Sequence, residues 1–131
     1  MKREIINPWS WQEKYGFVHA NKVSGAGTLL FLAGQVGVDE SGECRFPDNM
    51  ERQLDQVVSN IATILKHAGM DFTHVVRLVV YTVDMQKMLD AHDHMASLLM
   101  NNNCRHAGTL VGVNALSAPG ALVEIEVTAA C

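Results

Sequence analysis

Residues 122–127 alternate apolar and acidic side chains and contain the best candidates for acid–base chemistry. Successive side chains of a strand point to opposite faces, so Glu124 and Glu126 are expected to share one face of a sheet. A carboxylate beside a surface shielded from water binds a proton more tightly and can act as a general base or hold a water molecule. The alternative interpretation is a pair of solvated or ion-paired acids, which are common in sheets.

Cysteine and histidine residues offer two further kinds of chemistry. Cys104 precedes Arg105 and His106, a cationic setting that could lower the pKa of the thiol. An inert thiol is the favoured interpretation, because nothing in the sequence brings the three side chains together. No metal site is expected, since a convincing site needs three or four ligands and His92 and His94 would diverge on a helix. His92 is interpreted as a core histidine or as a hydrogen-bonding group that lines a cleft.

The composition indicates a single globular domain over residues 1–131. Hydrophobic residues make up 48% of the chain and charged residues 18%, which excludes a disordered protein. The net charge is −4 and the ten lysines and arginines are scattered, so nucleic acid is not an expected partner. No apolar stretch reaches the ~20 residues of a membrane helix, so no membrane partner is expected. Three cysteines at no ligand spacing suit reduced thiols and predict a cytoplasmic location.

Hydrophobic periodicity predicts the element order strand, strand, helix, strand, helix, strand, strand. The first helix is the clearest, with Asp48 as its predicted N-cap and Gly69 as its predicted C-cap. Asp84 is predicted to cap the second helix, whose apolar stripe includes Met85 and Leu89. The predicted strands are a first hairpin at 17–23 and 28–33, a buried strand at 75–83, and a closing pair at 109–116 and 122–129.

This order predicts an α+β fold in which two helices pack on one face of a mixed sheet, because right-handed crossovers place both on the same side. The strands at 28–33 and 75–83 are apolar on both faces. At roughly 25 cal/mol per Å², leaving the second face in water would forfeit several kcal/mol, comparable with the stability of the whole domain. Another copy of the chain is the simplest cover, so a homo-oligomer is expected.

Three segments carry a wider likeness: residues 30–35 (LFLAGQ), residues 69–85, and the closing strands within 109–127. Together, in order and spacing, they resemble the YjgF/RidA family, whose older names include the L-PSP endoribonucleases. The resemblance extends over residues 15–129. It implies a chorismate-mutase-like ββαβαββ fold, assembled as a homotrimer with three clefts between subunits. Well-known members hydrolyse reactive enamines and imines to a ketoacid and ammonia, and they need neither a cofactor nor a metal.

The resemblance also assigns roles to particular residues. The glutamate that positions the attacking water falls on Glu124, and the glycine whose backbone assists falls on Gly34, beside Ala33. The family's substrate-binding arginine falls on Thr109, and a threonine hydroxyl cannot form the bidentate charged pair that arginine forms with a carboxylate. The cysteine two positions beyond that arginine falls on Val111. The chain therefore resembles a subgroup that lacks the carboxylate-binding arginine.

The remaining ligand-binding candidates come from other parts of the sequence. The usual aromatic of the first strand falls near Phe17, which has no phenolic hydroxyl, and a helix asparagine falls on His92. The enzyme hypothesis is a deaminase or related hydrolase that acts on a C–N bond, with Glu124 handling water. His92, Arg105 or His106 would then replace the lost arginine. The rival hypothesis is a trimer that binds a small metabolite without turnover; ribonuclease activity fits poorly with the acidic charge balance.

Overall fold

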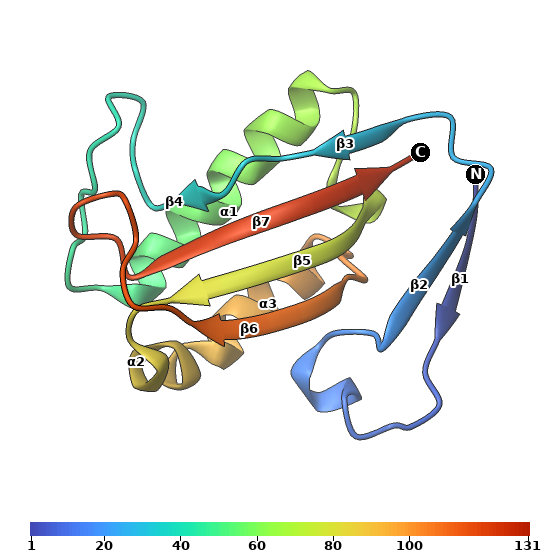
Figure 1. Cartoon of the computed structure of the whole chain (residues 1–131), viewed down its shortest axis with the longest axis horizontal. Coiled ribbons are helices and arrows are strands. Elements are labelled where there is room, and N and C mark those ends of the chain that lie inside the picture. The colour runs from blue at the N-terminus through green and yellow to red at the C-terminus, as the bar shows by residue number, and fades with distance from the viewer.

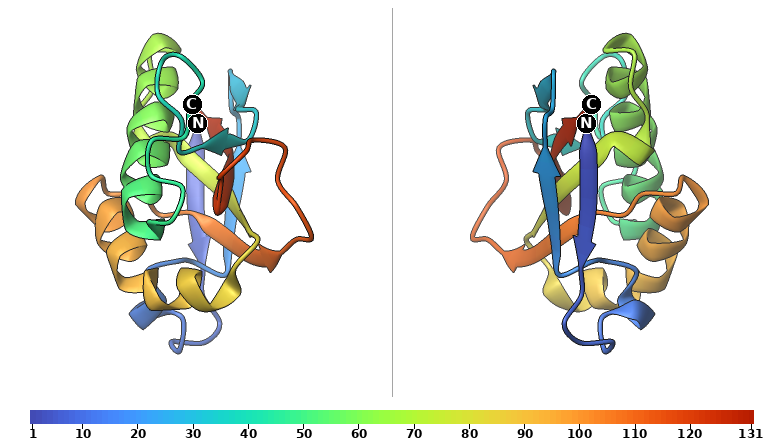
Figure 2. Two further views of the ribbon diagram at one scale, coloured as in Figure 1. Left: turned by 90° about the vertical axis from the view of Figure 1, so that its left-hand side faces the viewer. Right: turned by 90° about the vertical axis from the view of Figure 1, so that its right-hand side faces the viewer.

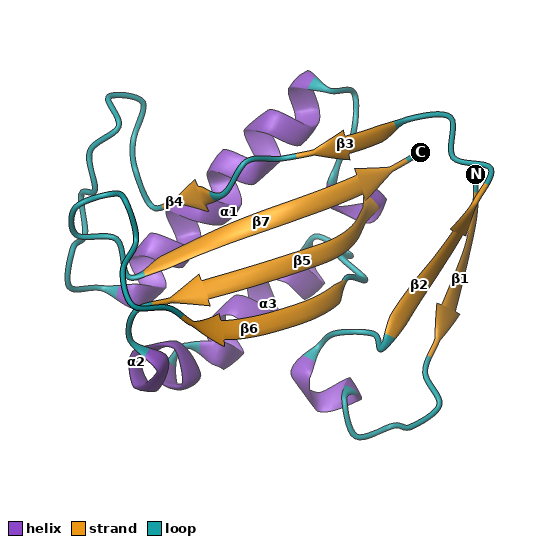
Figure 3. Ribbon diagram, viewed as in Figure 1, coloured by secondary structure: helices purple, strands orange, loops and turns teal.

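The computed structural model describes residues 1–131 and contains a mixed β-sheet backed on one face by helices (Figure 1). The strand order is β3-β7-β5-β6, and the short β4 also pairs with β7. Two side views place the helices on one side of this sheet (Figure 2), and colouring by secondary structure separates the two layers (Figure 3). The predicted α+β architecture is therefore confirmed. The strands are β3 (Leu29–Phe31), β4 (Gln35–Val36), β5 (Val75–Thr82), β6 (Ala107–Gly112) and β7 (Val123–Ala130).

The helix layer begins with α1 (Met50–His67). Its N-cap is Asn49 and not the predicted Asp48, because the side-chain oxygen of Asn49 accepts the hydrogen bond from the backbone N–H of Arg52 at 3.0 Å. At the other end, Gly69 has a φ of 70°, the left-handed conformation that commonly follows a helix. None of the helices is both long and apolar enough to cross a membrane.

The second predicted helix is divided in two at Ala91, into α2 (Met85–Asp90) and α3 (His92–Asn101). Asp84 caps α2 as predicted, since its carboxylate accepts from the N–H of Lys87 at 3.0 Å. Two residues of the predicted stripe, Met85 and Leu89, are exposed. The sheet covers only one narrow side of this helix pair, so the buried stripe is reduced to Met88, Ala91, Met95 and Leu99.

Both predicted strand pairs are wrong, although their strands exist. β2 (Ala20–Ser24) pairs with β1 (Lys2–Ile6), a polar strand that the hydrophobic pattern did not reveal, and β3 pairs with β7. The closing strands β6 and β7 are separated by β5, which runs parallel to β6 and antiparallel to β7. Strand edges offer the same backbone groups whatever the sequence, so packing of the whole sheet, and not proximity along the chain, selects the partners.

The β1–β2 ribbon stands apart from the main sheet beside the start of β5 (Figure 1). The guanidinium of Arg3 donates to the carbonyl oxygens of Thr73, at 2.8 Å, and Val75. The side-chain amide of Asn21 donates to the carbonyl oxygens of Val76 and Arg105, at 2.8 and 2.9 Å. The ribbon is therefore held to the sheet by side chains that satisfy backbone carbonyls where the regular ladder stops.

The core lies between α1, α3 and the inner face of the sheet. Alternate residues of β7 point into it and are at most 1% exposed: Val123, Ile125, Val127 and Ala129. From α1, Leu54, Val57, Ile61 and Leu65 meet them and are fully buried. The intervening β7 residues, Glu124 and Glu126 among them, lie on the opposite face, which no helix covers.

This uncovered face, called the outer face below, carries apolar side chains that remain in contact with solvent. Phe31 is 72% exposed and Leu29 is 56% exposed, and both lie on the edge strand β3. The predicted surplus of apolar surface is therefore present, whereas the predicted homo-oligomer remains a prediction.

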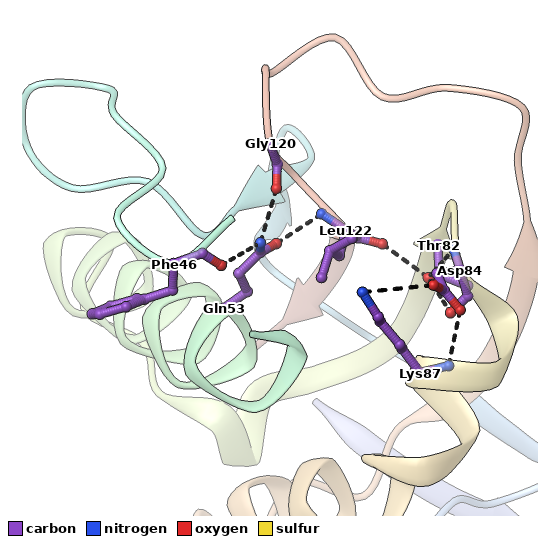
Figure 4. Close-up of polar contacts among 7 residues, drawn as sticks. All are labelled: Phe46, Gln53, Thr82, Asp84, Lys87, Gly120 and Leu122. Carbon is purple, nitrogen blue, oxygen red and sulfur yellow. Dashed lines mark hydrogen bonds and ion pairs between the residues drawn. The ribbon is translucent and has the colours of Figure 1, made fainter. Parts of the chain in front are cut away.

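A buried polar cluster sets where β7 begins (Figure 4). The side-chain nitrogen of Gln53, on α1, donates to the carbonyl oxygens of Phe46 and Gly120 at 2.8 and 2.9 Å. Its side-chain oxygen accepts from the N–H of Leu122 at 2.8 Å. The Thr82 hydroxyl donates to the carbonyl oxygen of Leu122 at 2.8 Å. Because residue 122 is held from both sides, the register of β7 and the face of each of its side chains are determined.

Candidate functional site

Glu124 occupies the outer face in a row that crosses three strands. Tyr81 of β5 is the register partner of both Glu124 on β7 and Val111 on β6. Neighbouring strands lie ~4.8 Å apart, so about 10 Å separates the backbones at Val111 and Glu124. The next row has the same form, with Val79 between Thr109 and Glu126. The resemblance-based candidates Glu124, Thr109 and Val111 therefore share one face of the sheet.

Gly34 lies directly against the side chain of Glu124. A Cβ atom added at Gly34 would stand 2.7 Å from the Cδ atom and 2.9 Å from the Cγ atom of Glu124. Glycine is therefore required if the glutamate is to keep its present position. The turn is held locally, because the side-chain nitrogen of Gln35 donates to the carbonyl oxygen of Ala33 at 3.0 Å. The structure thus places Gly34, next to Ala33 in the chain, against the side chain of Glu124.

The two carboxylates of β7 have different surroundings. The Glu126 carboxylate lies 3.7 Å from the guanidinium of Arg77 and accepts a hydrogen bond from the Tyr81 hydroxyl at 3.4 Å. Partial burial, together with the charge of Glu126, raises the pKa of the Tyr81 phenol, which therefore stays protonated and acts as a donor. The Glu124 carboxylate has no hydrogen-bond or ion-pair partner within the chain. It remains available to a water molecule or a ligand.

Arg77 and Tyr81 are neighbours of the site that the sequence interpretation missed. They occupy alternate positions in β5, so their shared face could have been read from the period of two within residues 75–83. The near-continuous apolar run concealed this signal, and an irregularity in pairing between Val75 and Arg77 shifts the register at the start of the strand.

Phe17, His92 and Thr109 line a cavity of about 600 Å³ between the N-terminal loop, the α2–α3 pair and β6. The Tyr15 and His92 rings meet edge to face with centroids 5.6 Å apart. Trp11 and Phe17 meet in the same way at 5.9 Å. Neither Gly34 nor Glu124 lines this cavity. Thr109 lies on the outer face and also lines this cavity. Ala33, Gly34 and Glu124 are called the glutamate group below, and the cavity lined by Phe17, His92 and Thr109 is called the aromatic cavity.

Arg105 and His106 do not act together in the way their adjacency suggested. Arg105 lines a different cavity, of about 470 Å³, together with Cys104. His106 lines the aromatic cavity, but burial lowers its pKa to about 4, so it is neutral at neutral pH and supplies no positive charge.

Cys104 is an inert thiol in this structure. Burial raises its pKa to about 12 and outweighs the charge of Arg3, which agrees with the favoured interpretation of an inert thiol and not with the alternative of a lowered pKa. Its sulfur lies 3.7 Å from the Nδ1 atom of His106. No group of three or more histidine, cysteine, aspartate or glutamate side chains comes together in a way that could hold a metal ion.

The fold and the glutamate group define a class of proteins: a mixed sheet backed on one face by helices, with a glycine packed against a strand glutamate. The family model described as Endoribonuclease L-PSP matches residues 13–131. The chain therefore belongs to this family, which is also the YjgF/RidA family.

Relatives agree with this assignment across most of the chain. A RutC family protein of Aquifex aeolicus is 28% identical over 128 residues, covering 97% of this chain and 98% of the relative. A 2-iminobutanoate/2-iminopropanoate deaminase of Rattus norvegicus is 29% identical over 100 residues, covering 76% of this chain and 71% of the deaminase. The crystal structure of the Rid family protein YyfB from Yersinia pestis, of unknown function, matches with a TM-score of 0.87 and 31% identity over the full length of both chains.

Proposed function

We propose that this chain is a small-molecule hydrolase that deaminates an imine or enamine, with water positioned by Glu124. The observation that carries the proposal is the glutamate group, in which a carboxylate without protein partners is held against the backbone of Gly34. Distant relatives such as the Rattus norvegicus protein are named as 2-iminobutanoate/2-iminopropanoate deaminases, which supports the same kind of reaction.

Glu124 can carry the protons that the hydrolysis requires. Glu124 accepts a proton from water as the oxygen attacks the carbon of the C=N bond, and it returns this proton to the nitrogen, which gives a neutral carbinolamine. Glu124 then takes the hydroxyl proton of the carbinolamine and passes it to the amino nitrogen, so that the carbon–oxygen double bond forms, the C–N bond breaks and ammonia leaves. One water molecule and one imine thus give one carbonyl compound and one ammonia, and Glu124 returns to its ionised state.

We propose further that the complete site lies in a cleft between subunits of a homotrimer. The outer face needs a cover, and Phe31 alone exposes 72% of its surface. The glutamate group and the aromatic cavity are separate in one chain, and juxtaposing two chains is the simplest way to combine them. The family resemblance implies a trimer, in which a neighbouring subunit would cover the outer face and bring the glutamate group and the aromatic cavity together.

The substrate is proposed to differ from the 2-imino acids of arginine-bearing family members. Thr109 stands where the resemblance places the carboxylate-binding arginine, and the neutral His106 does not replace its charge. Arg77 holds a guanidinium on the same face but is paired with Glu126. 2-Iminopropionate is therefore expected to be a poor substrate, and turnover that matches an arginine-bearing relative would contradict this part of the proposal.

The test is the Glu124→Gln variant, with Glu126→Gln as its matched control on the same strand and face. Ammonia release is measured over a panel of imines and enamines generated in situ, and the oligomer is checked by light scattering. Glu124→Gln should abolish release, a loss of at least about 10²-fold, while the oligomer stays intact. Glu126→Gln should retain most of the activity. An unchanged rate in Glu124→Gln would remove this residue from the mechanism.

The alternative function is a trimer that binds a small metabolite without turnover, and the cavity of about 600 Å³ favours it as the second candidate. Mass spectrometry of the purified protein provides the comparison. A retained ligand, with no ammonia released from any member of the panel, would support this alternative and reject the hydrolase.

A further inference from the structure

The residues that line the aromatic cavity indicate the chemical class of ligand that fits it, which the glutamate group does not. It is lined by Trp11, Tyr15 and Phe17 from the N-terminal loop and by His92 from α3, and its volume of about 600 Å³ falls in the range of small-molecule sites. Trp11 is 56% exposed and Tyr15 is 41% exposed. Large rings in contact with water at the mouth of a cavity gain free energy when a ligand covers them.

The geometry of these rings favours a flat apolar partner. Trp11 meets Phe17 at an interplanar angle of 71°, and Tyr15 meets His92 at 83°. Edge-to-face contacts of this kind are favourable between aromatic groups and are made equally well by an aromatic ligand. The apolar side chains of Leu78, Val80 and Leu110 form part of the remaining wall.

The charges around the cavity select against an anion. None of its lining residues is a lysine or an arginine; Lys14 has its Nζ atom 4.9 Å from the centroid of the Tyr15 ring but is not among them. The only carboxylate among the lining residues is that of Asp93, whose side chain is fully exposed. The buried His106 is neutral at neutral pH because its pKa is lowered to about 4. A carboxylate brought into the cavity would lose its hydration without gaining a cationic partner, which is unfavourable. An ammonium group on the side of Asp93 would instead remain in contact with water and lie near the exposed carboxylate of that residue.

We propose that the aromatic cavity binds an arylalkyl amine, or the corresponding imine, that carries no carboxylate group. The aryl group lies among Trp11, Tyr15 and Phe17, and the nitrogen lies toward the side occupied by His92 and Asp93. The inference names the substrate class of the proposed hydrolase and rests on that proposed function only for the hydrolysis that follows binding. The binding itself is tested separately.

The experiment compares three probes of similar size on the full-length protein: 2-phenylethylamine, 2-phenylethanol and 3-phenylpropionate. Isothermal titration calorimetry gives the affinities, and tryptophan fluorescence reports on the cavity because Trp11 lines it. The amine is expected to bind at least about tenfold more tightly than the acid. Equal or tighter binding of the acid, or no binding of either the amine or the alcohol, would overturn the proposal.

Two matched pairs of variants locate the binding. Trp11→Ala should weaken the amine at least about tenfold, whereas Trp9→Ala should leave its affinity unchanged, because Trp9 is 62% exposed in the same loop but does not line the cavity. Asp93→Asn should reduce the preference for the amine over the alcohol without weakening the alcohol, whereas Asp90→Asn should not. Equal effects within either pair would place the ligand elsewhere.

The outcome for this inference is separable from the outcome for the proposed function. If the amine preference is observed but no arylalkyl imine releases ammonia, the hydrolase is rejected and the binding site stands. If 2-iminopropionate is hydrolysed rapidly and the amine does not bind, the binding inference is rejected and the hydrolase stands.

Discussion

Alanine at position 34 would place a methyl group where the side chain of Glu124 now lies. The new carbon would stand 2.7 Å from the Cδ atom and 2.9 Å from the Cγ atom of Glu124, whereas carbon atoms in contact prefer about 3.5–4.0 Å. The obstructing atoms belong to the outer part of a flexible side chain, so the chain can still fold if the carboxylate moves. We therefore expect the substitution to displace Glu124 by about 1 Å.

The expected cost falls on catalysis and not on folding. A misplacement of about 1 Å in a catalytic group can lower a rate by about 10²-fold, which corresponds to about 2.7 kcal/mol of activation free energy. The free energy of unfolding should change by no more than about 1 kcal/mol. A strained Glu124 rotamer costs about 0.5–1.5 kcal/mol, and the reduced freedom of the unfolded chain returns about 0.4–1 kcal/mol because Gly34 does not have a positive φ.

Ammonia release and urea unfolding are measured on Gly34→Ala and on the control Gly27→Ala. A Cβ atom at Gly27 would have its nearest neighbour, the carbonyl oxygen of Cys131, at 4.0 Å, so the control adds the same methyl group without displacing anything. The control should retain native activity. If Gly34→Ala kept its rate within about threefold of the native protein, the position of Glu124 would not matter and the mechanism would be refuted.

Three further predictions concern stability and assembly. Gln53→Met should remove three hydrogen bonds and leave the N–H of Leu122 without a partner, while the carbonyl oxygens of Phe46 and Gly120 keep the Asn49 N–H and the Cys44 thiol. We expect it to lower the free energy of unfolding by about 2 kcal/mol and the Tm by about 6 °C, whereas Gln86→Met on the surface should not; a loss below about 0.5 kcal/mol in urea unfolding would contradict the assigned role. Phe31→Glu should dissociate the oligomer in light scattering, whereas Met100→Glu, at a side chain of α3 that is 60% exposed and does not line the aromatic cavity, should not; an unchanged mass for Phe31→Glu would show that the outer face is not the interface. The pKa of His106 is about 4 in the folded chain and 6.5 in the unfolded chain, so the unfolded chain binds more protons between these two pH values. The free energy of unfolding of the native protein should therefore decrease as the pH falls from 6.5 to 4. His106→Leu should flatten this decline, and an identical decline in the variant would exclude His106 as its source.

Features that depend on neighbouring residues were predictable from the sequence. The period of two in residues 122–127 correctly placed Glu124 opposite the buried valines, because alternation is a property of any extended strand. The helix at Met50–His67 followed from its apolar spacing. The one-residue error at its N-cap has a simple cause: Asp48 and Asn49 are both good caps, and only the backbone conformation decides which side chain reaches the free N–H.

Features that depend on contacts between distant segments were decided by the tertiary structure. Strand pairing was one, because backbone edges carry no sequence code and the whole sheet selects the partners. The pKa of Cys104 was another: the sequence left a lowered pKa open beside the favoured inert thiol, and burial by the surrounding structure raises it to about 12.

The sequence by itself determined that the chain folds as an α+β domain with apolar surface to spare and that Glu124 shares the spare face, because both follow from local alternation of side chains. Only the tertiary structure set Gly34 against Glu124, paired Arg77 with Glu126, and kept the aromatic cavity apart from both. These are contacts between segments far apart in the chain, and their distances are fixed by how the sheet, the helices and the N-terminal loop pack together.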